Sequence, residues 1–303
     1  MRPFDIQVNG YIGADFCSPD LPLEKCRQAC DELAADGVDS ILATVITDTV
    51  EALCTKLSRL AAFREADPVI ARMIAGFHIE GPFLNAAPGY IGAHPPDCVC
   101  PANVDDAKRL LDATRGLTRL VTLAPENDPG LATTAYLASQ CITVSAGHCD
   151  PTLDQLRAAI DAGLSMVTHL GNGCPVTLPR HDNFIQRALS LSDRLWICYI
   201  PDGAHVPFFA LKNYLAVSGV ERSIMVTDAI SAAKLGPGVY DLSGAPVEID
   251  AHGVARRPGS PNLAGSTVTM PQVRENLARH LGLAEADIAR LVDENPRRAV
   301  GLA

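Results

Sequence analysis

Short runs of apolar residues recur along the chain and alternate with amphipathic stretches of helical periodicity. The apolar runs are rich in Val, Ile and Leu and show no strict alternation of apolar and polar positions. This pattern is typical of parallel strands that are buried on both faces. Eight such runs are predicted to be strands: Asp5–Gly10, Ser40–Thr47, Ile74–Gly81, Leu120–Glu126, Cys141–His148, Met166–Asn172, Leu195–Gly203 and Ser223–Ala229.

The stretches around these strands predict helices: Leu23–Ala35, Val50–Glu65, Thr152–Ala162, Pro207–Ser218, Thr269–Leu281 and Glu285–Asp293. A repeated strand–helix order indicates a parallel sheet, and eight units favour a closed (β/α)8 barrel of the TIM type. An open, doubly wound sheet is the alternative. The sequence lacks the G-x-G-x-x-G and P-loop motifs that often accompany that fold, so we expect the barrel.

The segment Gly236–Leu263 holds many Gly and Pro residues and predicts a long loop or a hairpin. No stretch has the composition of a linker, so we expect residues 1–303 to form a single barrel domain.

Composition limits the partners of the chain. Of its 303 residues, 48% are hydrophobic, which is enough for a large core, and the formal net charge is -10. A basic surface is missing, so nucleic acid is not an expected partner. No apolar run approaches the roughly 18 residues that cross a bilayer, and the amino-terminal residues do not resemble a signal peptide. We therefore expect a cytoplasmic protein without a membrane partner.

The ten cysteines are expected to be reduced in that compartment. Only Cys26 and Cys30 have the spacing of a paired zinc-ligand motif, and the predicted helix places them one turn apart. We interpret them as small core residues.

Ionisable residues gather at the carboxyl ends of the predicted strands, where the active sites of such barrels lie. They are Glu80, Glu126, His148, His169, Asp202, His205 and Asp228. Two imidazoles and one carboxylate form a standard catalytic zinc set, which Glu80, His148 and His169 supply. Asp228 is then placed to carry a proton between the attacking water and the leaving amine. Each residue also has a structural alternative, such as capping by Asp228, but the alternatives do not explain the combination.

Motifs along the whole chain carry a family resemblance. They include Asp5–Gly10, Gly76–Asn85 (Gly-Phe-His-Ile-Glu-Gly-Pro-Phe-Leu-Asn), Gly92–Pro95, Val121–Glu126, Val144–His148, Thr168–Leu170, Asp202–Val206, Val226–Ala229, Leu263–Met270 and Asn295–Ala299. With these motifs in this order, the chain resembles the N-acetylglucosamine-6-phosphate deacetylase family of the amidohydrolase superfamily.

The resemblance implies a role for each matching residue. Glu80, His148 and His169 would hold the metal, and Asp228 would be the general acid and base. His94 would stabilise the oxyanion that develops on the substrate carbonyl. The sugar or its phosphate would be contacted by His205, Asn172, the backbone of Gly173, Arg180 and Leu263. Arg180 matches a phosphate-binding arginine that a neighbouring subunit can lend, so the resemblance also implies a homodimer.

The chain departs from the family pattern at several positions. Gln7-Val8-Asn9 replaces the His-x-His that binds a second metal in many amidohydrolases, so we expect one divalent ion, with Zn²⁺ first and Fe²⁺, Co²⁺ or Mn²⁺ as alternatives. Gly171–Cys174 replaces Tyr-Asn-Ala-Met, and the sequence around Arg180 differs from Gly-Arg-Glu-Pro-Gly. The small β-sandwich that is usual in the family is expected to be absent.

These features predict a metal-dependent deacetylase that hydrolyses the acetamide of an N-acetylated amino sugar phosphate, with N-acetylglucosamine-6-phosphate as the first substrate. An amidohydrolase for an unphosphorylated N-acyl sugar or N-acyl amino acid is the alternative that the altered Gly171–Cys174 segment leaves open. A catalytically silent sugar-binding barrel is the alternative from another class.

Overall fold

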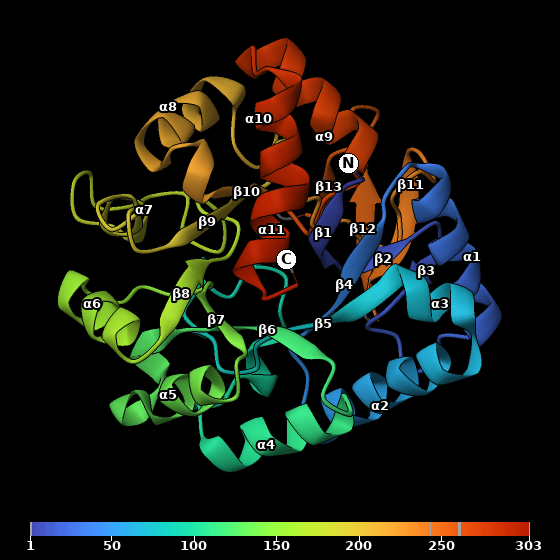
Figure 1. The fold of residues 1–303 in the computed structure, drawn as a ribbon, viewed down its shortest axis with the longest axis horizontal. Coiled ribbons are helices and arrows are strands. Elements are labelled where there is room, and N and C mark those ends of the chain that lie inside the picture. Colours follow the sequence, from blue (N-terminus) through green and yellow to red (C-terminus); the bar gives the residue numbers. More distant parts are fainter. Residues whose placement is uncertain (1, 243, 260–261, 303) are drawn as a thin grey trace.

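Eight parallel strands form the central sheet of the computed structural model, which describes residues 2–242, 244–259 and 262–302. The sheet follows the chain order: β1 (Phe4–Val8), β4 (Ser40–Ile46), β5 (Ile74–Glu80), β6 (Thr118–Leu123), β7 (Thr143–Ala146), β8 (Leu164–Val167), β9 (Trp196–Tyr199) and β10 (Ser223–Met225). A parallel bridge from Val8 to Ala229 joins its two edges. The predicted (β/α)8 barrel is therefore confirmed (Figure 1).

Helices surround the barrel (Figure 1). They are α1 (Leu23–Ala35), α2 (Val50–Ala66), α3 (Pro68–Met73), α4 (Val104–Ala113), α5 (Ala132–Ser139), α6 (Leu153–Asp161), α7 (Phe184–Leu189), α8 (Phe208–Ser218), α9 (Met270–Asn276), α10 (Glu285–Ala289) and α11 (Asn295–Ala299). The π-helical turns Leu277–Leu281 and Arg290–Glu294 continue α9 and α10. Local capping fixes several starts: Thr152 and Gln155 form a capping box at α6, and Asn183 caps α7. None of the helices in the described ranges is long and apolar enough to span a membrane.

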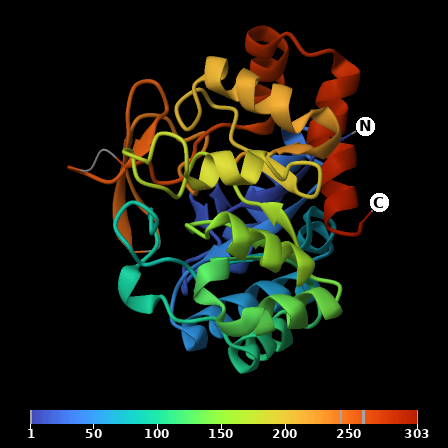
Figure 2. The same ribbon diagram turned by 90° about the vertical axis from the view of Figure 1, so that its left-hand side faces the viewer.

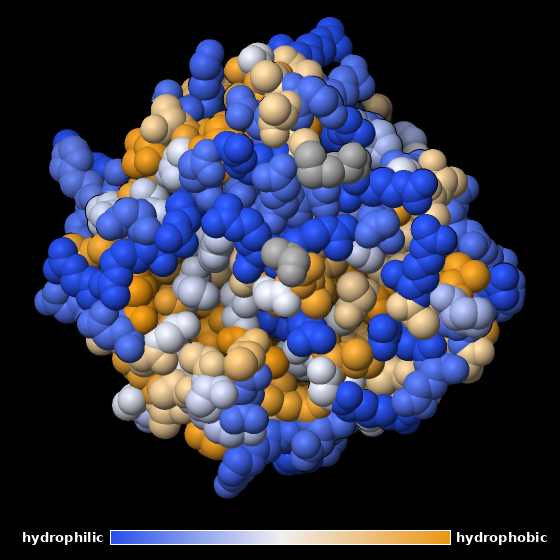
Figure 3. All heavy atoms as spheres, viewed as in Figure 1, coloured by the Kyte–Doolittle hydropathy of each residue, from blue (hydrophilic) through white to orange (hydrophobic). Residues whose placement is uncertain are grey.

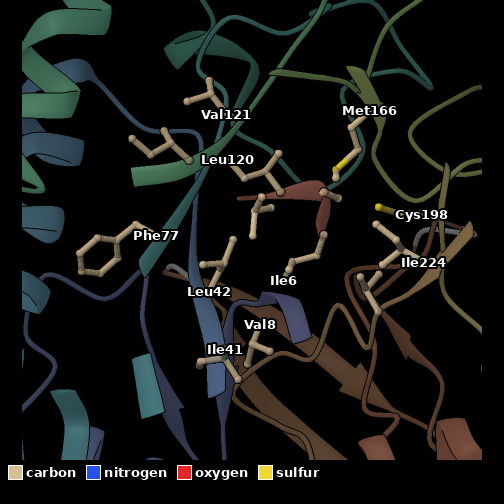
Figure 4. Close-up of a cluster of buried hydrophobic side chains, with 14 of the residues drawn as sticks. Ile6, Val8, Ile41, Leu42, Phe77, Leu120, Val121, Met166, Cys198 and Ile224 are labelled. Carbon is tan, nitrogen blue, oxygen red and sulfur yellow. The ribbon is translucent and has the colours of Figure 1, made fainter. Parts of the chain in front are cut away.

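The hydrophobic core fills the space between strands and helices. Figure 4 shows part of it, with buried side chains from β1, β4, β5, β6, β8, β9 and β10. The cysteines of α1, Cys26 and Cys30, are buried in this core as free thiols. Outside the core, the face seen in Figure 3 is largely hydrophilic, with small apolar areas among the charged side chains.

The barrel interior also contains a layer of hydrogen-bonded polar side chains. The two ring nitrogens of His78 contact the hydroxyls of Thr44 at 3.3 Å and Thr122 at 2.7 Å. The Thr168 hydroxyl then bonds to Thr122 at 2.7 Å and to Ser145 at 2.6 Å. Burial lowers the pKa of His78 to about 4, so its imidazole is neutral and joins two strands as a structural group.

The segment predicted as a loop or hairpin forms a small antiparallel sheet of β11 (Gly238–Leu242), β12 (Ala245–Ile249) and β13 (Ala255–Arg256). Its residues 243, 260 and 261 lie outside the described residues. A short hairpin, β2 (Gly10–Tyr11) and β3 (Ala14–Asp15), follows β1. Figure 2 places the β11–β13 sheet and the loop around residue 90 at one end of the molecule, and the two termini at the other.

Most strands end earlier than predicted, and three predicted site residues, His148, His169 and Asp228, lie just beyond them. His148, His169 and Asp228 have positive φ angles of 51°, 32° and 51°. Residues other than glycine rarely adopt positive φ angles, and a strand cannot continue through a residue that does. Hydropathy does not reveal this change of direction, because the residues remain buried.

Candidate metal centre and active site

Three potential metal ligands converge at the carboxyl end of the barrel. Glu80 is the last residue of β5, whereas His148 and His169 follow β7 and β8. Glu80 Oε1 lies 3.0 Å from His169 Nε2 and 3.2 Å from His148 Nε2, and the two Nε2 atoms are 3.1 Å apart. All three side chains are buried. Within the described residues they form the cluster of His, Cys, Asp or Glu side chains that is close enough to hold a metal ion. The arrangement suits a divalent metal ion.

The protonation of these groups fits a metal site. Burial alone would raise the pKa of Glu80, but the neighbouring imidazoles of His148 and His169 hold it well below its usual value, so the group is a carboxylate. His148 Nδ1 lies 2.7 Å from the carbonyl oxygen of Tyr90. This carbonyl can only accept, so Nδ1 carries the proton and the lone pair of Nε2 faces Glu80.

Two glycines make room for the imidazole of His148. A Cβ atom on Gly173 would lie 2.8 Å from Nδ1, and a Cβ atom on Gly92 would lie 3.0 Å from Cε1. Both glycines have positive φ angles, near 60°. The backbone of two loops therefore encloses the ring, and Gly173, expected to contact phosphate, lies against a candidate metal ligand.

Asp228 and His94 flank this centre. Burial and the nearby charge of Glu80 raise the pKa of Asp228 to about 6. Burial and the neighbouring His148 lower the pKa of His94 to about 3, so His94 is neutral. The backbone N–H of Thr47 donates to His94 Nδ1 at 3.4 Å, which leaves the ring proton on Nε2, 3.9 Å from Glu80 Oε1. Asp228 is thus suited to proton exchange and His94 to hydrogen-bond donation.

The side-chain amides of Gln7, in β1, and of Asn9, just after β1, face the carboxylates of the site. Gln7 Nε2 donates to Glu80 Oε2 at 3.3 Å, and Asn9 Nδ2 donates to Asp228 Oδ1 at 2.7 Å. These bonds orient the two carboxylates through the N–H groups of the amides.

A cavity of about 430 Å³ opens above these groups. Among the residues expected from the sequence, its lining includes Glu80, His94, His148, His169, Asn172, Gly173, His205, Asp228 and Leu263. Arg180 is exposed and does not line this cavity. The structure therefore brings together all the predicted site residues except Arg180.

His205, two residues beyond the predicted strand Leu195–Gly203, is oriented by Asp202. Asp202 Oδ2 lies 2.6 Å from His205 Nδ1, and Oδ1 accepts the backbone N–H groups of Ala204 and His205 at 2.9 and 2.8 Å. Burial would raise the pKa of Asp202, but the bond with His205 keeps it below its usual value. The ionised Asp202 fixes Nδ1 as a donor, so Nε2 is left for a ligand.

Several residues of the cavity lining were not predicted from the sequence. Arg256, on β13, is an arginine in the cavity wall, and it pairs with Asp250 of the same small sheet at 3.1 Å. Pro175, Val176 and Leu178 form an apolar part of the wall, where Val176 is 90% exposed. The doublet Arg256-Arg257 after the Gly-rich turn was the available signal, but only the fold places it over the barrel.

The fold and this site define a (β/α)8-barrel protein with a buried candidate metal centre at the carboxyl ends of its strands. No family model matches the chain. An N-acetylgalactosamine-6-phosphate deacetylase from Escherichia coli O157:H7 is 30% identical over 300 residues, with 98% of the chain and 77% of the relative covered. An N-acetylglucosamine-6-phosphate deacetylase from Bacillus subtilis is 29% identical, with 98% and 74% covered.

The solved structure of N-acetyl-D-glucosamine-6-phosphate deacetylase from Mycobacterium smegmatis, a mutant in complex with N-acetyl-D-glucosamine-6-phosphate, superposes with a TM-score of 0.90. It is 34% identical, and the match covers 99% of this chain and 77% of that one. The chain therefore belongs to the N-acetylglucosamine-6-phosphate deacetylase family, which confirms the resemblance found in its motifs.

Proposed function

We propose that this chain hydrolyses the acetamide of an N-acetylated amino sugar phosphate and releases acetate and the free amine. The observation that carries this proposal is the convergence of Glu80, His148 and His169 on one point of the cavity, with Asp228 and His94 beside it. The relatives named above act on two such sugars, and N-acetylglucosamine-6-phosphate is the first to test.

Glu80, His148 and His169 are the proposed ligands of one divalent metal ion. Zn²⁺ is our first choice, and Fe²⁺, Co²⁺ and Mn²⁺ suit the same donors. When bound, such an ion polarises a carbonyl and lowers the pKa of water from about 15.7 to about 7. We propose one ion per chain, because the neutral amides of Gln7 and Asn9 are weak ligands for a second one.

Asp228 is the proposed proton carrier. Its carboxylate takes a proton from the attacking water as the new C–O bond forms, and it returns that proton to the amide nitrogen as the C–N bond breaks. A pKa of about 6 suits both transfers near neutral pH. The bond from Asn9 holds Oδ1 at 2.7 Å, so Oδ2 is free to exchange the proton.

His94 is the proposed donor to the carbonyl oxygen as negative charge develops on it. Its proton lies on Nε2, the ring atom that faces Glu80. The Thr47 hydroxyl, 2.8 Å from Nδ1, helps to fix the ring. A neutral, preoriented donor needs little reorganisation during the reaction.

The sugar end of the substrate is assigned to other lining residues of the cavity. His205, oriented by Asp202, Asn172 and Leu263 are the proposed sugar contacts. Arg256 is the proposed phosphate contact from the same chain, since its guanidinium is always charged. Arg180 is exposed and does not line this cavity, and it is the proposed phosphate contact that a second copy lends in a homodimer.

A second candidate is the deacetylation of an unphosphorylated N-acyl sugar. The apolar wall of Pro175, Val176 and Leu178 favours it, because an apolar wall gives no partner to a phosphate. An unphosphorylated substrate would have no phosphate to pair with the guanidinium of Arg256.

The test is acetate release by zinc-loaded protein from N-acetylglucosamine-6-phosphate, N-acetylgalactosamine-6-phosphate and N-acetylglucosamine. We expect turnover of a phosphorylated sugar, and loss of at least about 100-fold in kcat when Asp228→Asn removes the proton carrier. Turnover of the neutral sugar alone would support the second candidate. Failure of all three by protein that binds one metal would refute the amino sugar substrate.

A further inference from the structure

We infer that Tyr90, Asp150 and Arg187 form a positioning network that holds the imidazole of His148 in the orientation and tautomer needed to bind a metal. The inference rests on the metal site proposed above. It adds three residues to that site, none of which supplies a ligand or lines the cavity.

The network begins at the backbone of Tyr90. Its carbonyl oxygen accepts the Nδ1 proton of His148 at 2.7 Å, which directs the Nε2 lone pair toward Glu80. A hydrogen bond to the outer ring nitrogen is the usual way in which proteins orient a histidine ligand. Here the acceptor lies in the loop between β5 and α4, so the position of this loop decides how well the ring is held.

The side chain of Tyr90 anchors the loop. Its hydroxyl donates to Asp150 Oδ2 at 2.8 Å. The turn itself has two local backbone bonds, from the N–H groups of Tyr90 and Ile91 to the carbonyl of Ala87 at 3.1 and 3.2 Å. These bonds shape the turn but do not tie it to the barrel. The bond to Asp150 does so at Tyr90, beside the ties that Asn85, Ala93 and His94 make elsewhere in the same loop.

Asp150 is in turn fixed by Arg187 of α7. Arg187 Nη1 donates to Asp150 Oδ1 at 2.7 Å and to the carbonyl of Pro151 at 3.0 Å, and its Nε donates to Asp182 at 2.6 Å. Only 13% of the Arg187 side chain is exposed. A largely buried guanidinium with three acceptors is a rigid anchor, because losing any acceptor would leave a charge poorly solvated.

The network closes on His148 itself, because Asp150 lies two residues further along the chain. The Asp150 N–H donates to Glu126 Oε1 at 2.6 Å, and the Asn85 N–H donates to the carbonyl of His148 at 3.0 Å. The short segment 148–150 therefore anchors, through Asp150, the loop whose Tyr90 carbonyl holds the imidazole of His148. Such multiple restraint is what a residue with a φ of 51° requires to persist.

The experiment measures the zinc dissociation constant by competition with a chromogenic chelator, independently of turnover. We expect Tyr90→Phe and Arg187→Met each to weaken zinc binding on the order of 10-fold. The double variant should lose little more zinc affinity than either single variant, since both residues act on His148 through the same chain of hydrogen bonds. Arg187→Lys should recover part of the affinity through its pairing with Asp150.

Arg194→Met is the matched control, because Arg194 makes a similar 2.6 Å pair with Asp161 at the end of α6. It should bind zinc as the wild type does. Wild-type affinity in folded Tyr90→Phe would overturn the inference while leaving the proposed function intact, and this variant decides the question if Arg187→Met does not fold. A wild-type protein that binds no zinc would overturn the proposed metal site and this inference together.

Discussion

Replacing Gly173 by Ala tests whether the loop after β8 fits tightly around His148. The new Cβ would lie 2.8 Å from Nδ1 and 3.1 Å from Cγ and Cε1 of the ring, so the ring or the loop must shift by about half an ångström. That shift would disturb the 2.7 Å bond to Tyr90 and the direction of Nε2. We expect zinc affinity to fall on the order of 10-fold, about 1.4 kcal/mol.

The backbone cost of the same substitution is separable. Gly173 has a φ of 60°, where an alanine costs roughly 1 kcal/mol by itself. Gly130 is the matched control, because its φ is 63° and a Cβ there would meet nothing within 4 Å. In urea unfolding of the metal-free protein, Gly130→Ala should lose about 1 kcal/mol, and Gly173→Ala at least as much, because its Cβ also meets the ring of His148.

Zinc competition distinguishes the two variants. Only Gly173→Ala should lose affinity for zinc, whereas Gly130→Ala should match the wild type. Equal zinc binding by both variants would refute the close fit around His148. A rise in KM for a phosphorylated substrate, with unchanged zinc affinity, would instead support the phosphate contact first expected for Gly173.

Two further predictions concern charge. Arg256→Ala should raise KM for a phosphorylated sugar on the order of 10-fold and leave KM for an unphosphorylated sugar unchanged. Arg180→Ala should have the same effect only if a second copy lends that arginine. Steady-state acetate release measures KM, and light scattering measures the oligomeric state; equal effects on both sugars would contradict the phosphate role. Burial raises the pKa of Asp5 from 3.8 to about 7, so the folded protein holds a proton there that the unfolded chain has lost. The contribution of Asp5 to the free energy of unfolding should therefore fall as pH rises from about 4 to about 7, by up to roughly 4 kcal/mol, and stay level above pH 7. Denaturation of the wild type and Asp5→Asn across this range checks it, because the variant should lack this contribution; parallel curves would contradict the assignment.

The sequence predicted the main helices well where apolar periodicity and capping agree. The range Leu23–Ala35 is the helix α1 itself, and the start of α6 beside Thr152 follows from a capping box formed by neighbours in the chain. Strand ends were predicted less well. The predicted strands that end at or beyond His148, His169 and Asp228 include residues that leave the strand with positive φ, a change that composition does not reveal.

The residues of the site likewise include some that the sequence predicted and some that it did not. Glu80, His148, His169 and Asp228 were predicted because the carboxyl ends of parallel barrel strands meet at one rim, whatever their separation in the chain. Arg256 was missed, because β13 belongs to a small sheet whose position over the barrel depends on long-range packing. Arg180 was expected, from a motif match, as an arginine that a neighbouring subunit can lend, and it is exposed outside the cavity of this chain.

The sequence by itself therefore determined the barrel and the chemical types at its rim, because both depend on local periodicity and on residue identity. The tertiary structure decided which atoms meet. The contact of Gly173 with the ring of His148, and the chain of bonds from Arg187 through Asp150 to Tyr90, join loops that lie far apart in sequence. Such contacts depend on how loops pack, and no local pattern of residues encodes that packing.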